Sequence, residues 1–281
     1  DNPHTKPVSF WQWVIGEIQA AHPDAIFLSE AFTRPKMMRT LAKAGFTQSY
    51  TYFTWRNSKR ELTDYLLELT QGEMKEYFRG NFFTNTPDIL PEILQQGGPA
   101  AFKFRLALAA TLSPSYGIYS GYELCENRAI PGTEEYLDSE KYQYKVWEWD
   151  RPGAITDYIA KNNAIRRENP PLQEYENLPF YETDNEQVLF YGKSTMDRRN
   201  SVLVAVNLNP FQAQTAQLSI PLNTAGIEPD ETYQLHELIT DQRNLVTGPM
   251  HTIRLDPHQE PAAIFTIRRW SHREQNFDYF M

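Results

Sequence analysis

The sequence lacks the features that several protein classes require. It has one cysteine, Cys125, in 281 residues, so no internal disulfide can form. A chain of this size without bridges is typical of a reducing compartment, and we expect a cytoplasmic protein. No stretch approaches the roughly 18 consecutive apolar residues that a membrane-spanning helix needs, which predicts no membrane partner.

Neither acidic nor basic residues are concentrated in one part of the chain. The 27 basic and 36 acidic side chains give a net charge of -9 without long single-sign runs, which argues against nucleic acid or anionic lipid as a partner. The six histidines show no paired ligand spacing, and there is no glycine-rich phosphate loop. We therefore expect no metal and no cofactor, and an uncharged or weakly charged ligand.

What the first part of the sequence does contain is an alternation of strand-like and helical runs, typical of parallel βα units. A capping box, Ser58-x-x-Glu61, opens one of the helices. The run at 25–28 is apolar throughout, which predicts a strand buried on both faces of a sheet. The predicted strands are 25–28, 46–53, 82–83 and 116–120, and the predicted helices are 9–22, 35–44, 62–69, 100–112 and 155–168.

The second part of the sequence has a different rhythm. A polar, irregular segment at 124–150 is longer than a structural connector requires and is a candidate functional loop. Beyond it, strand-like runs separated by turn residues follow one another without helices, which predicts an antiparallel sandwich. We expect two domains, at 1–172 and 173–281. The predicted strands of the second are 188–191, 201–207, 216–220, 232–238, 251–255 and 262–267.

Acidic residues recur where the predicted parallel strands end. Glu30, Asp88 and Glu123 follow three of the strands, and Asp1 stands where a preceding strand would have ended. Taken singly, such an acid is more often a helix N-cap or a solvated turn residue. Functional groups nevertheless collect at the carboxyl ends of strands in this architecture, and two carboxylates are the minimal equipment for glycosyl transfer.

Four successive motifs carry a resemblance to a known family. They are residues 1–7 (DNPHTKP), 27–35 (FLSEAFTRP), 85–88 (NTPD) and 137–142 (LDSEKY). Together they resemble the α-1,4-glucan:maltose-1-phosphate maltosyltransferases of the α-amylase superfamily, and the similarity runs from residue 1 to about residue 265. The resemblance implies an α/β fold, the C-terminal half of a (β/α)8 TIM barrel, followed by an all-β antiparallel sandwich domain.

The same resemblance implies roles for individual residues. Asp1 matches the nucleophile, Glu30 the general acid/base, and Asp88 the third acid, which binds sugar hydroxyls. Generic α-amylases usually have histidine before the third acid, whereas this chain has Pro87, which favours the maltosyltransferase branch.

The donor pocket and the reaction are also implied by the resemblance. Asn2 would lie beside the transferred group, and Lys141 with Tyr142 would line the donor pocket. The implied enzyme is a retaining glycosyltransferase of glycogen and α-glucan biosynthesis. It would move maltosyl from α-maltose 1-phosphate to the non-reducing end of an α-1,4-glucan acceptor and release phosphate. We expect the complete enzyme to be a homodimer.

Two other functions stay open from the sequence. One is an α-glucan hydrolase or a trehalose-forming isomerase on the same scaffold, and the other is a non-catalytic glucan-binding module. Half a barrel would also leave one side of the sheet uncovered. We therefore expect residues 1–281 alone to be inactive, to expose apolar surface around Phe27 and the helix that starts at Ser9, and to self-associate or bind the other half.

Overall fold

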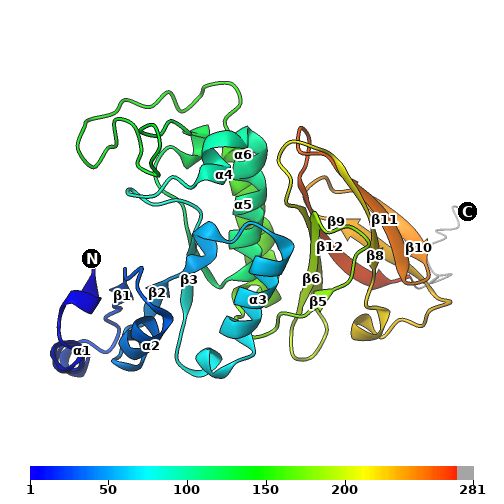
Figure 1. The fold of residues 1–281 in the computed structure, drawn as a ribbon. Helices are drawn as coiled ribbons and strands as arrows, with labels where there is room; N and C mark the ends of the chain where they lie inside the picture. The colour runs from blue at the N-terminus through cyan, green and yellow to red at the C-terminus, as the bar shows by residue number, and fades with distance from the viewer. Residues whose placement is uncertain (271–281) are drawn as a thin grey trace, which may run out of the picture.

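The first layer of the molecule is a four-stranded parallel sheet in the order β1-β2-β3-β4. The structure is a computed structural model that describes residues 1–270. Figure 1 shows the chain passing from this sheet, through a helical layer, to a β domain on the other side. The strands are β1 (Leu28–Ser29), β2 (Gln48–Tyr50), β3 (Gly80–Phe83) and β4 (Ser115–Gly117).

The helices between and beside these strands agree with the predicted helical runs. The capping box is present: the Ser58 hydroxyl accepts from the Glu61 backbone N–H, and the Glu61 carboxylate accepts from the Ser58 backbone N–H. The one short helix that the sequence reading missed is α4. The helices are α1 (Val8–Ala21), α2 (Pro35–Lys43), α3 (Lys59–Thr70), α4 (Glu92–Gln96), α5 (Gly98–Leu112) and α6 (Thr156–Glu168).

Short 3-10 helices occupy several of the connections. One of them corrects the predicted strand at 46–53, because β2 ends at Tyr50 and the chain then turns into η2. These elements are η1 (Pro3–Thr5), η2 (Tyr52–Trp55), η3 (Glu73–Glu76), η4 (Tyr122–Leu124), η5 (Pro170–Gln173) and η6 (Leu222–Ala225).

The first strand is where the sequence prediction was wrong. Only Leu28 and Ser29 pair, and they pair with β2 alone. Leu28 is 45% exposed and Ile26 is 69% exposed, so the run at 25–28 is not buried on both faces. Phe27, which we expected at the centre of the exposed surface, packs instead against a small core that contains Ile15 and Phe46.

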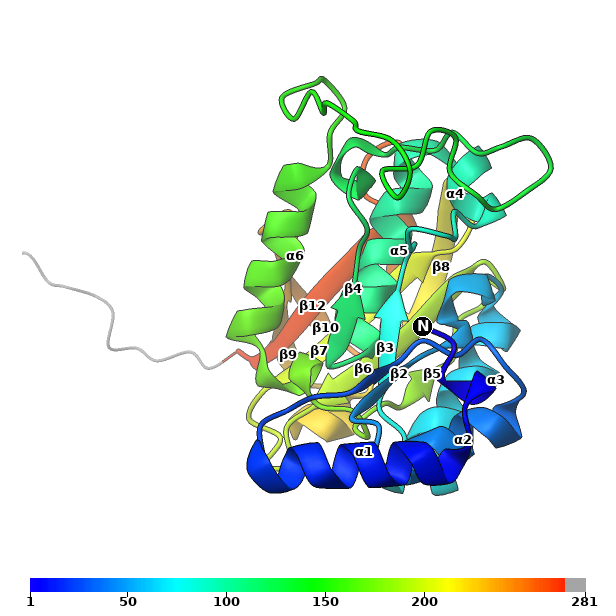
Figure 2. The ribbon, with the colours of Figure 1, turned by 90° about the vertical axis from the view of Figure 1, so that its left-hand side faces the viewer.

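Helix α1 also exposes apolar side chains. Phe10, Trp13 and Ile18, three of the large hydrophobic residues of that helix, are 41%, 63% and 38% exposed. Figure 2 shows α1 running across the foot of the sheet, outside its other elements. Within residues 1–270, no helix is long and apolar enough to cross a membrane.

The β domain consists of two antiparallel sheets that share one core. Six strands form the larger sheet, in the order β10-β9-β12-β7-β6-β5, and β11 pairs with β8 in the smaller one. Buried side chains of both sheets, such as Phe190, Phe265 and Leu218, form one hydrophobic cluster. The strands are β5 (Phe180–Tyr181), β6 (Val188–Ser194), β7 (Ser201–Asn207), β8 (Gln214–Ser219), β9 (Thr232–Glu237), β10 (Arg243–Thr247), β11 (Met250–Leu255) and β12 (Ala262–Arg269).

Helix α5 joins the two parts. It is apolar around most of its circumference, and twelve of its residues are buried, as expected for a helix with protein on all sides. On the side of the β domain, the Thr111 and Tyr191 hydroxyls lie 2.6 Å apart, and Lys103 Nζ lies 3.0 Å from Glu260 Oε1. The helix therefore fixes the β domain against the parallel sheet.

On the other side, one fully buried arginine connects α5 to the chain that follows β2. Arg105 donates 2.6 Å hydrogen bonds to the carbonyl oxygens of Phe53 and Arg56, and its guanidinium carbon lies 3.9 Å from the centroid of the Phe53 ring. Burial lowers the pKa of Arg105 to about 10, which still leaves it charged at neutral pH. This contact fixes the connection that starts at the carboxyl end of β2.

Candidate active site

Asp1 and Glu30 lie next to each other where β1 ends. The Asn2 backbone N–H donates a 3.0 Å hydrogen bond to the Glu30 carbonyl oxygen. The Asp1 backbone nitrogen lies 3.9 Å from Glu30 Oε2, and the Asn2 side-chain amide donates to Asp1 Oδ1 at 2.8 Å. The Glu30 side chain is 31% exposed, so its carboxylate is partly buried at this edge.

Local contacts explain why residues 1–5 follow this path. Asn2 adopts the left-handed conformation, with φ 44°, which asparagine tolerates better than most residues. The Thr5 hydroxyl donates to the Asn2 carbonyl at 2.9 Å, which closes the turn. The indole N–H of Trp11 on α1 donates to the Pro3 carbonyl at 2.8 Å, so α1 holds the segment in place.

Aromatic rings cover the neighbouring strand ends. The Phe32 ring lies 5.8 Å from Tyr50 and 5.1 Å from Trp55, and Tyr50 lies 4.5 Å from Phe83, between ring centroids. Burial, with a smaller contribution from the Glu30 carboxylate, raises the pKa of Tyr50. Its hydroxyl therefore stays protonated next to Glu30 and can donate a hydrogen bond. None of these rings was among the site residues predicted from the sequence.

The position of Phe83 depends on a glycine in the adjacent strand. A Cβ atom at Gly117 would lie 2.2 Å from the Phe83 ring, which no side chain could accommodate without moving the ring. Gly117 and Phe83 are register partners in β4 and β3. Glycine at this position thus allows the aromatic ring to lie over the end of the sheet.

A second group forms around Asp88, in the connection that follows β3. The Lys141 ammonium forms an ion pair with Asp88 Oδ1 across 53 positions of sequence. The hydrogen bond to Asp88 raises the pKa of Lys141, so the ammonium stays charged. Lys141 Nζ also lies 5.4 Å from the ring centroid of Tyr142, which is 78% exposed. The structure thus brings together three of the residues that the sequence singled out.

A cavity of about 240 Å³ opens beside this group. It lies between the connection after β3 and the segment at 124–150, which we predicted to be a functional loop. Its lining includes Asp88, Tyr136, Ser139 and Tyr142. Of the predicted donor-binding residues, Tyr142 borders this cavity, and Lys141 is paired with Asp88, which also lines it.

A buried network that the sequence reading missed supports the Asp88 connection. Asn85 is fully buried, and its amide donates a 2.6 Å hydrogen bond to the Tyr136 hydroxyl. Its carbonyl oxygen accepts from the Tyr119 backbone N–H at 2.9 Å and from the Thr84 hydroxyl at 3.1 Å. Three segments of the chain are thereby locked together. The available sequence signal was the place of Asn85 in the motif that ends at Asp88.

Trp55 links the end of β1, which carries Glu30, to the segment that contacts the connection carrying Asp88. Its indole N–H donates to Glu134 at 2.9 Å, and the Glu134 carbonyl accepts from the Leu90 backbone N–H at 2.6 Å. The same indole contacts Phe32, two residues after Glu30. The fourth strand-end acid, Glu123, lies on η4, and its backbone carbonyl accepts from the Ile155 N–H.

The chemistry available at this edge is that of carboxylates, one ammonium group and aromatic rings. Among residues 1–270, no group of three histidine, cysteine or acidic side chains is placed to hold a metal ion. Paired carboxylates can act as nucleophile and as general acid/base, and aromatic faces pack against sugar rings. The arrangement therefore suits glycosyl chemistry.

Known proteins similar to this chain are maltosyltransferases. The chain is 58% identical over 280 residues to the α-1,4-glucan:maltose-1-phosphate maltosyltransferase of Myxococcus xanthus, a match that covers 100% of this chain and 42% of that protein. It is 49% identical over 269 residues to the enzyme of that name from Pseudomonas aeruginosa, covering 96% of this chain and 40% of that protein. Residues 180–267 match the family model described as "GLGE, C-terminal".

The chain is homologous to the C-terminal part of the maltosyltransferases. It spans about two fifths of the length of the curated maltosyltransferases that it matches, as the coverage of 42% and 40% shows. The predicted resemblance is thus confirmed, and the similarity includes both the parallel sheet and the β domain.

Solved structures show the same fold at much lower identity. The α-amylase of Geobacillus thermoleovorans, solved with acarbose, superposes with a TM-score of 0.71 at 18% identity and covers 94% of this chain and 58% of that one. An Anoxybacillus α-amylase gives 0.72 at 15% identity, covering 95% of this chain and 57% of that one. The arrangement of the parallel sheet and the β domain is therefore that of the α-amylase fold.

Proposed function

We propose that this chain is the part of a maltosyltransferase that carries its catalytic acids, with 1–172 as the C-terminal half of a (β/α)8 barrel and 173–281 as its all-β domain. The observation that carries the proposal is the contact between the Asp1 segment and Glu30 at the carboxyl end of β1. A nucleophile and an acid/base must lie close together for retention, roughly 5 to 5.5 Å apart.

In the first step, the Asp1 carboxylate attacks the anomeric carbon of α-maltose 1-phosphate. The bond from that carbon to the phosphate oxygen breaks, phosphate leaves with the electron pair, and a β-maltosyl ester forms on Asp1. Because phosphate is a good leaving group, the reaction asks little of Glu30 as an acid. Asp88 binds sugar hydroxyls and stabilises the positive charge that develops on the ring.

In the second step, Glu30 removes the proton from the 4-hydroxyl at the non-reducing end of an α-1,4-glucan. That oxygen attacks the anomeric carbon, the ester to Asp1 breaks, and the second inversion restores the α configuration. The product is a glucan two glucoses longer. Tyr142, which lines the cavity beside Asp88, and the neighbouring Lys141, which pairs with Asp88, hold the donor. Asn2 orients the Asp1 carboxylate through the hydrogen bond at 2.8 Å.

The experiment that tests this function is phosphate release from maltose 1-phosphate by the complete enzyme, with and without a glucan acceptor. Transfer predicts sustained release only when acceptor is present. Free maltose in the absence of acceptor would instead support a hydrolase, and glucan binding without any turnover would support a binding module. Dimerisation of the complete enzyme and its cytoplasmic location stay predictions.

A further inference from the structure

The loop at 137–149 carries the proposed donor-binding residues, yet little of its surface is packed. The side chains of Tyr144 and Val146 are 94% and 83% exposed. A cavity of about 400 Å³ is lined both by residues 143–148 and by residues of the 124–128 segment. Packing along its length therefore contributes little to the shape of this loop.

Trp147 joins this loop to the connection that follows β4. Its ring lies so close to Gly121, the N-cap of η4, that a Cβ atom there would be 2.6 Å from Trp147 Cη2. Gly121 also has φ 88°, a left-handed conformation that glycine adopts without strain. Glycine thus accommodates both the backbone turn and the ring, and the contact anchors the loop just beyond the carboxyl end of β4.

The indole N–H of Trp147 connects this anchor to the turn that carries the donor-binding lysine. It donates a 2.8 Å hydrogen bond to Glu140 Oε1, and Glu140 directly precedes Lys141. The carbonyl oxygen of Ser139 accepts from the backbone N–H groups of the third and fourth residues after it, at 3.0 and 2.9 Å, which closes the turn. The Lys141 side chain leaves this turn to pair with Asp88. The turn is therefore held by its own hydrogen bonds and by Trp147.

We propose that Trp147 is a positioning residue, which holds the turn at 139–143 so that Lys141 stays within reach of the donor. This inference rests on the proposed function, which assigns Lys141 to the donor pocket. Without the Trp147 contact, donor binding would also have to order the turn, and that ordering has an entropic cost. The KM for maltose 1-phosphate would then rise, whereas kcat would change little, because Asp1 and Glu30 lie at another strand end.

The first test uses hydrogen–deuterium exchange of the complete enzyme without ligand, measured in peptides that cover 139–143. Glu140→Ala removes the acceptor of the indole N–H, so exchange there should become about fivefold faster, as expected for the loss of one hydrogen bond. Glu140→Gln keeps an oxygen that can accept the same bond and should exchange like the wild type. Wild-type exchange in Glu140→Ala, or equally fast exchange in both variants, would overturn the proposal.

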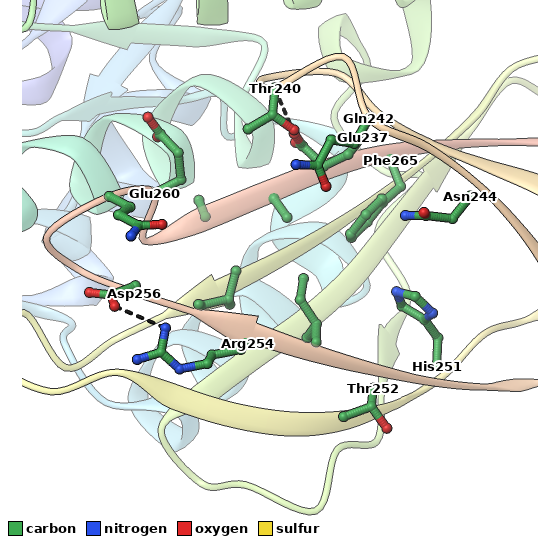
Figure 3. Close-up of a pocket in the computed structure, with 15 residues that line it drawn as sticks. Glu237, Thr240, Gln242, Asn244, His251, Thr252, Arg254, Asp256, Glu260 and Phe265 are labelled. Atoms are coloured by element: carbon green, nitrogen blue, oxygen red, sulfur yellow. Dashed lines mark hydrogen bonds and ion pairs between the residues drawn. The ribbon is translucent and has the colours of Figure 1, made fainter.

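Two control variants separate this contact from a general loss of charge or of an ion pair. Glu148→Ala removes an exposed acid of the same loop. Arg254→Ala breaks an ion pair of similar length, 2.9 Å to Asp256 Oδ2, beside a cavity of the β domain (Figure 3). That domain lies across the α5 layer from the parallel sheet (Figure 1). Both variants should keep wild-type exchange at 139–143, and faster exchange in either would contradict a specific role for the Trp147 bond.

The second test asks whether the contact acts through Lys141. In Glu140→Ala the KM for maltose 1-phosphate should rise by about fivefold with kcat unchanged, and Glu140→Gln should keep the wild-type KM. When Lys141→Ala is already present, Glu140→Ala should raise the KM no further, because changes that act through one shared residue are not additive. Additive increases in KM, or a lower kcat with an unchanged KM, would contradict the positioning role.

The two measurements distinguish failure of this inference from failure of the proposed function. Wild-type exchange in Glu140→Ala, with a raised KM in Lys141→Ala, would overturn the positioning role and leave the donor role of Lys141 standing. Faster exchange in Glu140→Ala, with an unchanged KM in Lys141→Ala, would keep the contact that orders the turn and remove Lys141 from the donor site.

Discussion

The backbone N–H of Asn2 donates a 3.0 Å hydrogen bond to the carbonyl oxygen of Glu30, which joins the segment of the proposed nucleophile to the strand end of the proposed acid/base. The two residues are far apart in sequence, and only the fold brings them together. This bond places the Asp1 segment and Glu30 on the same edge of the sheet.

Replacing Glu30 by glutamine in the complete enzyme tests the second step. The amide keeps the shape of the side chain but cannot accept the proton of the acceptor hydroxyl, so we expect transfer to fall on the order of 10²-fold or more, with donor binding retained. Steady-state transfer and equilibrium donor binding measure the two quantities. Glu92→Gln, on the exposed side of α4, is the control. Near wild-type transfer by Glu30→Gln would contradict the acid/base role.

We expect Lys141 to contribute to donor binding rather than to the stability of the fold. Its ion pair with Asp88 is about half exposed, and such pairs contribute roughly 0–1 kcal/mol. Lys141→Ala should therefore leave the urea midpoint almost unchanged while raising the KM for maltose 1-phosphate. Lys145→Ala, in the same loop, should raise it less. A large loss of stability with an unchanged KM would assign Lys141 a structural role.

The hydroxyl of Tyr136 should matter for stability. Tyr136→Phe removes the acceptor of the 2.6 Å hydrogen bond from Asn85 and leaves a fully buried amide N–H without a partner. Such a loss costs about 1–3 kcal/mol. Urea unfolding should show this decrease, whereas Tyr144→Phe, at a residue 94% exposed, should show none. Equal midpoints for the two variants would mean that the network does not stabilise the fold.

The buried Lys193 side chain should make the free energy of unfolding depend on pH. It is almost fully buried in β6, and burial, with repulsion from Arg166, lowers its pKa to about 7. The unfolded chain, with a lysine pKa near 10.4, therefore holds more protons than the folded one between about pH 7 and pH 10. The free energy of unfolding should rise with pH across that window, with a contribution of up to about 1.4 kcal/mol per unit.

Urea unfolding at several pH values in that window measures the slope. Lys193→Met removes the titrating group and should flatten the rise, while Lys161→Met, on the exposed side of α6, should not. An unchanged slope in Lys193→Met would show that Lys193 is not the group responsible.

Local signals account for what the sequence predicted well. Short sequence patterns predicted the capping box and the helices around it, and the structure contains them. The same is true of the strands β6, β7 and β12. Strand β10 was missed because nearly all its side chains are exposed and it pairs only through its neighbour β9. The buried charges of Arg105 and Lys193 could not be foreseen either, since their partners are backbone carbonyls distant in sequence.

For the site, the sequence indicated the acids but not what holds them. Glu30 and Asp88 were found from their places after predicted strands and from family motifs. The Asp88–Lys141 pair and the Asn85–Tyr136 bond connect residues about fifty positions apart, and no periodic pattern encodes such contacts. The assignment of the catalytic roles stays a prediction.

The exposed apolar surface of α1 and β1 predicts association of residues 1–281 when produced alone. Light scattering should give a mass above that of one chain, because Trp13 and Ile26 are 63% and 69% exposed beside other apolar residues. Trp13→Glu with Ile26→Glu should lower the mass. Phe211→Glu, at a single exposed ring of the β domain, should not. A monomer without these changes would contradict the prediction.

The most direct test of the account is the identity of the residue that carries the transferred sugar. The complete enzyme with Glu30→Gln is incubated with maltose 1-phosphate without acceptor, so that the ester forms with its good leaving group but is not passed on. Peptide mass spectrometry then locates the maltosyl group. We expect it on Asp1, in the peptide that contains residues 1–6, and a maltosyl group on any other residue would rule out Asp1 as the nucleophile.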